Sequence, residues 1–160
     1  MSVTRLYGRR MNDFDFLFGT WNVANRRLAE RLAGSDQWDE FPGVAVCAPH
    51  FGGAANVDEI VFPTLGYSGL TVRLYDPATR LWSIHWADSR TGTLGLPPMV
   101  GRFDGDRGVF SGDDSHEGKP VRCRYIWTRL GPDACRWEQA FSDDGERTWE
   151  TNWTMDFTRA

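Results

Sequence analysis

An alternation of apolar and polar residues recurs along almost the whole chain, and it limits the possible folds more than any other feature. Side chains of a β-strand point alternately to its two faces, so this period of two predicts strands with one buried face. Turn-forming residues interrupt the pattern repeatedly, as at Asp76-Pro77 and at Gly131-Pro132-Asp133. Helical periodicity is nearly absent. The sequence therefore predicts an all-β protein.

About ten strands are expected, and the short gaps between most of them indicate an up-and-down order. They cover residues 18–28, 38–49, 56–62, 69–75, 81–88, 100–104, 108–113, 121–130, 135–142 and 149–158. Residues 26–33 fit either the end of the first strand or a short lid helix. No linker or internal repeat divides the 160 residues, a length that suits one domain.

The last three strands can be phased against one another through their turns. Hairpins centred on Pro132 and on Gly145 place aromatic and amide side chains in three rows on one face. The rows are Trp127/Trp137/Trp153, Tyr125/Gln139/Thr151 and Cys123/Phe141/Trp149. The opposite face carries Arg122, Arg124, Arg136, Glu138, Ser142, Glu150, Asn152 and Asp156. With almost no helix to cover the aromatic face, closure into a barrel covers it and removes exposed edges.

The same reasoning assigns faces in two earlier parts of the sheet. Around Asp76-Pro77-Ala78-Thr79, the inward residues are Leu70, Val72, Leu74, Trp82, Ile84 and Trp86. The outward residues there are Thr71, Arg73, Ser83, His85 and Asp88. In the first strand, one face carries Gly19, Trp21, Val23, Asn25 and Arg27. Inward polar residues need partners, because an unpaired buried polar group costs free energy.

Composition excludes several classes of protein. A net charge of −4 and a pI near 5.3 argue against nucleic-acid binding, which needs a basic surface. No apolar run reaches the length of a membrane span or of a secretory signal. The three cysteines lack a Cys-x-x-Cys spacing, and no Walker, Gly-x-Ser-x-Gly or dinucleotide motif occurs. We expect a cytoplasmic protein without a cofactor, either a monomer or a homodimer.

The segment Phe16-Leu17-Phe18-Gly19-Thr20-Trp21 resembles the start of a calycin, the superfamily of lipocalins and fatty-acid-binding proteins. The longer segment Phe14-Asp15-Phe16-Leu17-Phe18-Gly19-Thr20-Trp21 also resembles the start of a bacterial set of calycin-like proteins of unknown function. The resemblance implies a calycin-like barrel over residues 12–160, a short helical turn before its first strand, and a flexible tail over residues 1–11. It further implies that Trp21 closes one end of the barrel and that Arg159 packs over it.

The segment Ser142–Trp149 resembles an Asp-box, the Ser-x-Asp-x-Gly-x-Thr-Trp hairpin of sialidases, with Glu146 in place of a glycine. In that motif the aspartate accepts hydrogen bonds from backbone N–H groups, and the tryptophan packs beneath the turn. We interpret the segment as a turn that stabilises a hairpin and not as a sign of glycosidase activity.

Barrels of this size have interiors that side chains fill or that hold one small ligand. The inward indoles fit both a solid core and an aromatic-lined pocket in which a few polar groups orient an apolar molecule. We expect a pocket for a small, largely apolar molecule, with aromatic and carboxylate-bearing molecules included. Its candidate ligand-binding residues are Asn25, Arg27, Trp82, Trp86, Trp127, Trp137, Gln139 and Trp153.

Two other functions stay open at this point. A cofactor-free cyclase or isomerase acting on a biosynthetic intermediate would use Glu59 and Tyr125 for acid–base catalysis. Of the neighbours Asp58 and Glu59, alternation sends one inward, and an apolar interior would raise the pKa of an inward Glu59 and suit it to proton transfer. Haem binding is the third function, with His50 as its ligand. No pair of histidines has the spacing of metal ligands on one strand, so no other metal site is expected.

Overall fold

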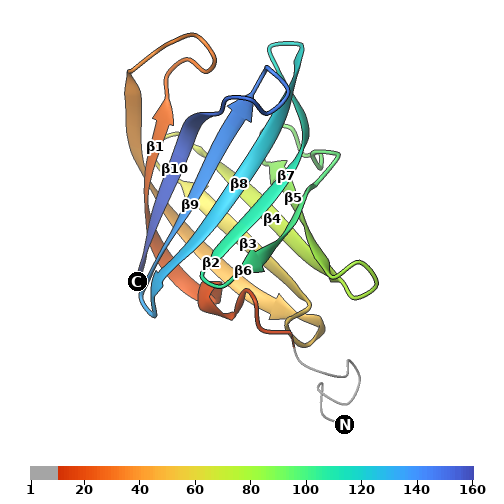
Figure 1. Cartoon of the computed structure of the whole chain (residues 1–160). Helices are drawn as coiled ribbons and strands as arrows, with labels where there is room; N and C mark the ends of the chain where they lie inside the picture. Colours follow the sequence, from red (N-terminus) through yellow and green to blue (C-terminus); the bar gives the residue numbers. More distant parts are fainter. Residues whose placement is uncertain (1–10) are drawn as a thin grey trace.

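The strands follow one another around a closed barrel in the order of the chain (Figure 1). The computed structural model describes residues 11–160. Its elements are η1 (Asp15–Leu17), β1 (Gly19–Leu28), β2 (Trp38–His50), η2 (Phe51–Gly53), β3 (Ala55–Phe62), β4 (Tyr67–Asp76), β5 (Leu81–Asp88), β6 (Met99–Asp104), β7 (Arg107–His116), β8 (Lys119–Gly131), β9 (Ala134–Ser142) and β10 (Glu150–Arg159). β1 pairs with β10 and closes the sheet. The predicted all-β, up-and-down barrel and its short N-terminal helical turn are confirmed.

Two predicted segments lie outside the strands or the described residues. The predicted tail over residues 1–11 falls outside the described residues except for Met11, which packs against the core. Of residues 26–33, the first three belong to β1 and the rest form bends, so this segment is no lid helix. Within residues 11–160, no helix is both long and apolar enough to cross a bilayer.

The segment before β1 closes one end of the barrel, which we call the plug end. The ring of Phe14 is fully buried there, 4.8 Å from the ring of Trp82 and 5.0 Å from that of Phe103, both edge to face. The indole Nε1 of Trp82 donates a hydrogen bond to the carboxylate of Asp13 at 3.0 Å. The opposite end, which we call the loop end, carries the long connections β1–β2, β5–β6 and β9–β10 (Figure 1).

Trp21 and Arg159 occupy the positions at the plug end that the resemblance implies. The guanidinium carbon of Arg159 lies 3.9 Å from the centre of the Trp21 ring, and the indole Nε1 donates to the carbonyl of Leu17 at 2.8 Å. Arg159 also donates hydrogen bonds to the carbonyls of Phe16 and Phe18. The first strand, the last strand and the plug segment are therefore joined at one point.

Gly19 is required by this joint for two reasons. Its φ of +111° lies in a region that side-chain-bearing residues rarely adopt. A Cβ atom at this position would also lie 2.7 Å from Nη1 of Arg159. The glycine of the Gly-x-Trp segment therefore makes room for the arginine that covers the tryptophan.

The register between β8 and β9 is the predicted one. The three predicted pairs are present: Trp127 with Trp137, Tyr125 with Gln139, and Cys123 with Phe141. The turn of this hairpin is short, and the two faces of its strands differ strongly in polarity. The same register keeps Cys123 and Cys135 apart, and all three cysteines are unpaired and buried.

The predicted register between β9 and β10 is wrong by one residue next to the turn and by two residues beyond it. At the turn, Phe141 pairs with Glu150 where Trp149 was predicted, and this offset places Thr151 outside and Asn152 inside. A β-bulge between Thr151 and Trp153 then inserts Asn152 as an extra residue, so Trp153 is also inward and pairs with Gln139. Thr151 and Asn152 therefore lie on faces opposite to those predicted for them.

The predicted faces of β4 are also wrong, and the turn that follows it is the reason. Asp76 pairs with Leu81, so the hairpin loop has four residues, 77–80, and its centre lies between Ala78 and Thr79. Leu74 and Trp82, both predicted to be inward and to face each other, would centre it on Ala78. Because side chains alternate between faces, an offset of one residue moves every side chain of the strand to the other face.

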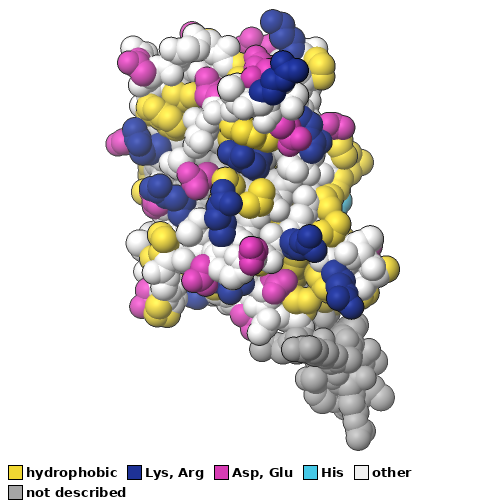
Figure 2. All heavy atoms as spheres, in the orientation of Figure 1, with side chains coloured by type: hydrophobic (Ala, Val, Ile, Leu, Met, Phe, Trp, Pro, Cys, Tyr) yellow, Lys and Arg dark blue, Asp and Glu magenta, His cyan; other side chains and the backbone are white. Residues whose placement is uncertain are grey.

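As a result, β4 has polar residues inside and apolar residues outside. Thr71 and Arg73 are buried and pair with Trp86 and Ile84 of β5. The residues predicted to be inward, Leu70 and Leu74, are 40% and 38% exposed. The outer surface beside them on β2 and β3 is apolar as well, with exposed Val44, Val46 and Val61. Figure 2 shows another face of the barrel, where lysine, arginine and acidic side chains are interspersed.

The loop between β9 and β10 is the stabilising turn that the Asp-box resemblance implies. Asp144 accepts hydrogen bonds from the hydroxyl of Ser142 at 2.9 Å, from the backbone N–H of Thr148 at 3.0 Å, and from the hydroxyl of Thr148 at 2.5 Å. These bonds, with those from Thr148 the strongest, lower the pKa of Asp144 to about 2. Trp149, predicted to be inward, instead packs on the outer face under the guanidinium of Arg124, at 4.3 Å.

Candidate functional site

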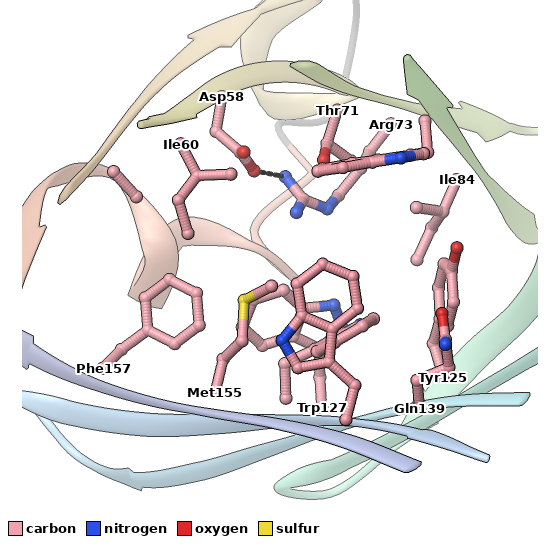
Figure 3. A pocket seen from close by; sticks show the side chains of 14 residues that line it. Asp58, Ile60, Thr71, Arg73, Ile84, Tyr125, Trp127, Gln139, Met155 and Phe157 are labelled. Atoms are coloured by element: carbon pink, nitrogen blue, oxygen red, sulfur yellow. Dashed lines mark ion pairs between the residues drawn. The ribbon is translucent and has the colours of Figure 1, made fainter. Parts of the chain in front are cut away.

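A cavity of about 70 Å³ lies inside the barrel between two unlike walls (Figure 3). A single water needs about 10–15 Å³ of such space, so the cavity exceeds the space for one water several times over. The charged wall consists of Asp58 on β3 and of Thr71 and Arg73 on β4. The aromatic wall, on β8, β9 and β10, consists of Tyr125, Trp127, Trp137, Gln139 and Trp153.

The indoles of the aromatic wall are held by contacts between rings. The rings of Trp137 and Trp153 meet edge to face, 5.5 Å apart at 86°, and the rings of Tyr125 and Trp137 are tilted by 60° and lie 5.1 Å apart. Such arrangements are favourable because the positive edge of one ring meets the negative face of another. The Nε1 of Trp153 donates to the side-chain carbonyl of Asn25 at 3.0 Å, which fixes the orientation of that indole. This wall is therefore a fixed apolar surface.

A buried ion pair forms the centre of the charged wall. Nη1 of Arg73 lies 2.5 Å from Oδ2 of Asp58, and it donates a hydrogen bond to the side-chain carbonyl of Asn56 at 2.8 Å. Arg73 is 3% exposed, and its guanidinium carbon lies 5.3 Å from the rings of both Phe14 and Trp127. A buried charge is tolerated when it is paired and hydrogen-bonded, so Arg73 and Asp58 each allow the burial of the other.

Behind this pair, the thiol of Cys47 is an inert part of the core. Its sulfur lies 3.7 Å from the side-chain oxygen of Asn56, to which it donates a weak hydrogen bond. Burial raises the pKa of Cys47 to about 12. Because the thiolate is the reactive form, Cys47 is not a nucleophile at neutral pH.

Tyr125 and Gln139 supply neutral polar groups to the aromatic wall. The amide of Gln139 donates to the side-chain carbonyl of Asn152 at 2.9 Å, so the inward bulge residue orients it. The hydroxyl of Tyr125 has no hydrogen-bond partner among residues 11–160. Burial raises the pKa of Tyr125 well above its ordinary value, so the phenol keeps its proton and serves as a donor.

Trp86 borders the cavity from β5 and is the most exposed of the indoles that line it. Its ring lies over Gly69 of β4, where a Cβ atom would be only 1.8 Å from the ring. Only glycine at this position leaves room for the indole. The ring also contacts Trp153 edge to face at 6.4 Å.

The structure brings together most of the predicted site residues. Those that line the cavity are Trp86, Trp127, Trp137, Gln139 and Trp153, together with Tyr125. Three predicted ligand-binding residues do not line it. Trp82 lies at the plug end against Phe14, and Asn25 is buried as the acceptor for Trp153. Arg27 stacks on Trp153 at 4.9 Å and donates to the hydroxyl of Tyr67 at 3.0 Å.

The proposed roles of Glu59 and His50 both require an inward side chain, and neither side chain is inward. Glu59 is exposed on the outer face of β3, because its neighbour Asp58 is the inward residue. An outward carboxylate has no access to the cavity, so acid–base catalysis there cannot use Glu59. His50 is exposed on the outer face at the end of β2, as are Val44 and Val46, with which it shares a strand face.

Sequence reasoning missed the main polar groups of the cavity, Arg73 and Thr71. Both were assigned to the outer face because Leu70, Val72 and Leu74 alternate with them and appeared to be the core residues. The signal in the sequence was an aspartate, Asp58, on one strand and an arginine, Arg73, on the strand that follows it. An inward carboxylate at Asp58 needs an inward cation, and among inward positions of β4 only Arg73 supplies one.

The described residues offer no obvious site for a metal or for haem. No group of three histidine, cysteine, aspartate or glutamate side chains lies close enough together in residues 11–160 to hold a metal ion. The haem hypothesis depended on an inward His50. The residues that line the cavity include no histidine, so the donor set does not fit a histidine-ligated haem.

No protein-family model and no curated protein sequence matches the chain. The cavity, with its charged and aromatic walls, is the feature of the described residues that offers a ligand both apolar contact and hydrogen bonds. The function is therefore inferred from the chemistry of this cavity.

Proposed function

We propose that the protein binds a small, largely apolar molecule, of which aromatic molecules are the best fit, inside the barrel. The observation that carries this proposal is a cavity in which aromatic rings surround a few polar groups that lack partners in the described residues, such as the Tyr125 hydroxyl. Buried polar groups are normally paired, so a molecule or waters must supply the missing hydrogen bonds. Binding pockets have the same composition, apolar walls with few polar groups.

Admission of the molecule requires Trp86 to move. The other indoles of the cavity are fixed by rings on both sides or by a hydrogen bond, whereas Trp86 is partly exposed and borders the cavity from β5. Rotation of its side chain would enlarge a cavity that is now about 70 Å³. Trp86 is thus proposed as the side chain that opens and closes the site.

The barrel is further proposed to be a calycin. The closed up-and-down order supports this, and so does the stack of Arg159 on Trp21 behind a short helical turn. The cytoplasmic location is part of the same proposal, and the three unpaired, buried thiols are in keeping with a reducing compartment.

The binding proposal is tested by a substitution that places a larger side chain in the cavity, at a residue that lines it. Ala45 is buried on β2 and lines the cavity, whereas Ala48 is exposed on the same strand. We expect benzamide and phenol to quench tryptophan fluorescence, and we expect both of them and indole to raise the melting temperature of the native protein. Ala45→Leu should abolish both effects, and the matched control Ala48→Leu should retain them. Equal binding to both variants, or no binding to the native protein, contradicts the proposal.

A second candidate function is cofactor-free isomerisation or cyclisation in the same cavity. The observation that favours it is a protonated phenol, Tyr125, and a carboxylate, Asp58, that line the same cavity. Acid–base catalysis needs such a donor and such an acceptor on either side of a bound molecule. Tyr125→Phe separates the two functions: an enzyme loses turnover and retains affinity, whereas a binding protein shows no turnover in either form.

A further inference from the structure

The ion pair on the charged wall leaves hydrogen-bonding atoms without a partner on both residues. Nη1 of Arg73 is taken by Asp58 and Asn56, while Nη2 has no hydrogen-bond partner in the described part of the chain. The Nε atom of Arg73 also lacks a partner there, but it is fully buried. On the other side, Oδ2 of Asp58 faces Arg73, and Oδ1 has no such partner either. Both residues line the cavity, and Figure 3 shows them side by side across from Trp127 and Met155. The wall therefore offers one donor beside one acceptor.

The pair also makes the wall electrically neutral. Arg73 already has its counter-ion at 2.5 Å, so a second anion would gain little from the guanidinium and would be repelled by Asp58. A cation would be attracted by Asp58 but repelled by Arg73. A charged molecule would also lose its hydration on entering an apolar cavity, and neither residue is free to compensate for that loss.

We propose that the charged wall selects a neutral molecule that carries a hydrogen-bond acceptor beside a donor, as in a primary carboxamide or a lactam, and rejects the corresponding carboxylate and amidinium. The acceptor receives a hydrogen bond from Nη2 of Arg73, and the donor gives one to Oδ1 of Asp58. This proposal rests on the proposed function, because it assigns the polar end of the molecule that the cavity binds. It narrows the expected ligands by removing those that carry a carboxylate.

The aromatic wall fixes the other part of the molecule. Trp127 lies beneath the guanidinium of Arg73, with 5.3 Å between the guanidinium carbon and the ring centre, and Trp137 and Trp153 line the same cavity, so a planar group that extends from the ion pair enters a space bordered by indoles. Tyr125 and Gln139 lie farther along the same wall and give a second polar contact. A flat ring with a carboxamide at one end fits this order of contacts.

Three molecules of nearly the same shape test the proposal: benzamide, benzoate and benzamidine. At neutral pH they are neutral, anionic and cationic. We expect the native protein to bind benzamide at least about tenfold more tightly than either ion, a difference of about 1.4 kcal/mol or more. Titration calorimetry measures the three affinities. Equal affinities, or tighter binding of an ion, overturn the proposal.

Charge-changing variants should reorder the three molecules. Asp58→Asn leaves Arg73 without a counter-ion, so benzoate should become the tightest ligand and should raise the melting temperature most. Arg73→Gln leaves Asp58 unpaired, so benzamidine should become the tightest ligand of that variant. The matched control is Glu59→Gln, which removes the same charge from the next residue on the outer face and should keep the native order. An unchanged order in Asp58→Asn overturns the proposal.

The proposal stays testable if the single variants do not fold. The double variant Asp58→Leu/Arg73→Met replaces both charges with apolar groups, a change that buried ion pairs often tolerate. It should bind toluene but lose the preference of the native protein for benzamide over toluene. Retention of that preference contradicts the proposed role of the pair.

The outcomes also distinguish this proposal from the proposed function. If the native protein binds toluene, phenol or indole in a manner that Ala45→Leu abolishes, but shows no preference for benzamide over its ions, only the selection by the ion pair fails. If neither these three molecules nor the benzamide series binds, the binding function itself fails.

Discussion

The two walls of the cavity are built from the same kind of strand but hold opposite chemistry. On the aromatic wall, inward rings such as Trp127 and Trp137 contrast with charged residues outside, so the strand pattern identifies its own buried face. On the charged wall, Arg73 is inside and Leu74 is outside, so the pattern points the wrong way. The difference teaches that an ion pair can occupy a core position when its partner lies on the adjacent strand.

The two walls should also respond differently to mutation. Loss of a ring leaves a space that neighbours partly fill, whereas loss of one charge leaves the other buried and unpaired. Each of the following variants tests one side of this contrast, beginning with the largest expected effect.

Arg73→Leu should be the most destabilising single change, at about 3–5 kcal/mol, because it leaves Asp58 buried without a counter-ion. The double variant Asp58→Leu/Arg73→Leu should recover most of that loss, since no unpaired charge remains. Urea denaturation monitored by tryptophan fluorescence measures both. A double variant less stable than Arg73→Leu would show that the pair contributes more than mutual neutralisation.

Gly69→Ala should destabilise the protein by about 1–3 kcal/mol, because the added methyl group would overlap the ring of Trp86. Because this loss of stability arises from overlap with one indole, adding Trp86→Ala should remove most of the destabilisation that Gly69→Ala causes. The double-mutant cycle measures the coupling between the two sites. Additive effects of the two substitutions would show that Trp86 already moves freely away from Gly69.

Tyr125 should make stability fall at alkaline pH. Burial raises its pKa in the folded protein, so its contribution is complete below the unfolded value of about 10 and decreases as the pH rises above it. Tyr125→Phe should therefore lose less stability than the native protein as the pH rises above about 10. Melting temperatures from neutral pH to about pH 11 provide the measurement, and parallel curves over the whole range would contradict the burial of the phenol.

The smallest effect is expected from Asp144, at acid pH. This residue lies in the loop that joins β9 and β10, two strands of the aromatic wall. Its pKa of about 2 lies below the unfolded value of about 3.9, so its contribution is complete above about pH 4 and is lost as the pH falls towards 2. Asp144→Asn should flatten this part of the melting-temperature profile. Asp143→Asn, at a residue without hydrogen bonds in the described hairpin, is the control and should follow the native profile.

Much of the fold was predictable, because turns and alternation are local signals. The ten strands, their order and the β8–β9 register follow from the Gly131-Pro132-Asp133 turn and from rows such as Trp127/Trp137. Six of the ten predicted site residues, from Trp86 to Trp153, line the cavity for the same reason. The bulge at Asn152 was not predictable, since nothing in the alternation around it signals an extra residue.

Alternation along the chain is enough to predict a barrel with indoles inside, because it depends only on neighbours along one strand. It did not determine which face of β4 is inside, because a shift of one residue in a four-residue turn exchanges the faces. That choice was made by contacts across strands: Asp58 of β3 needs Arg73, and Trp86 of β5 needs the space over Gly69. Burial of a charge depends on a partner distant in the chain, and only the tertiary structure brings that partner within reach.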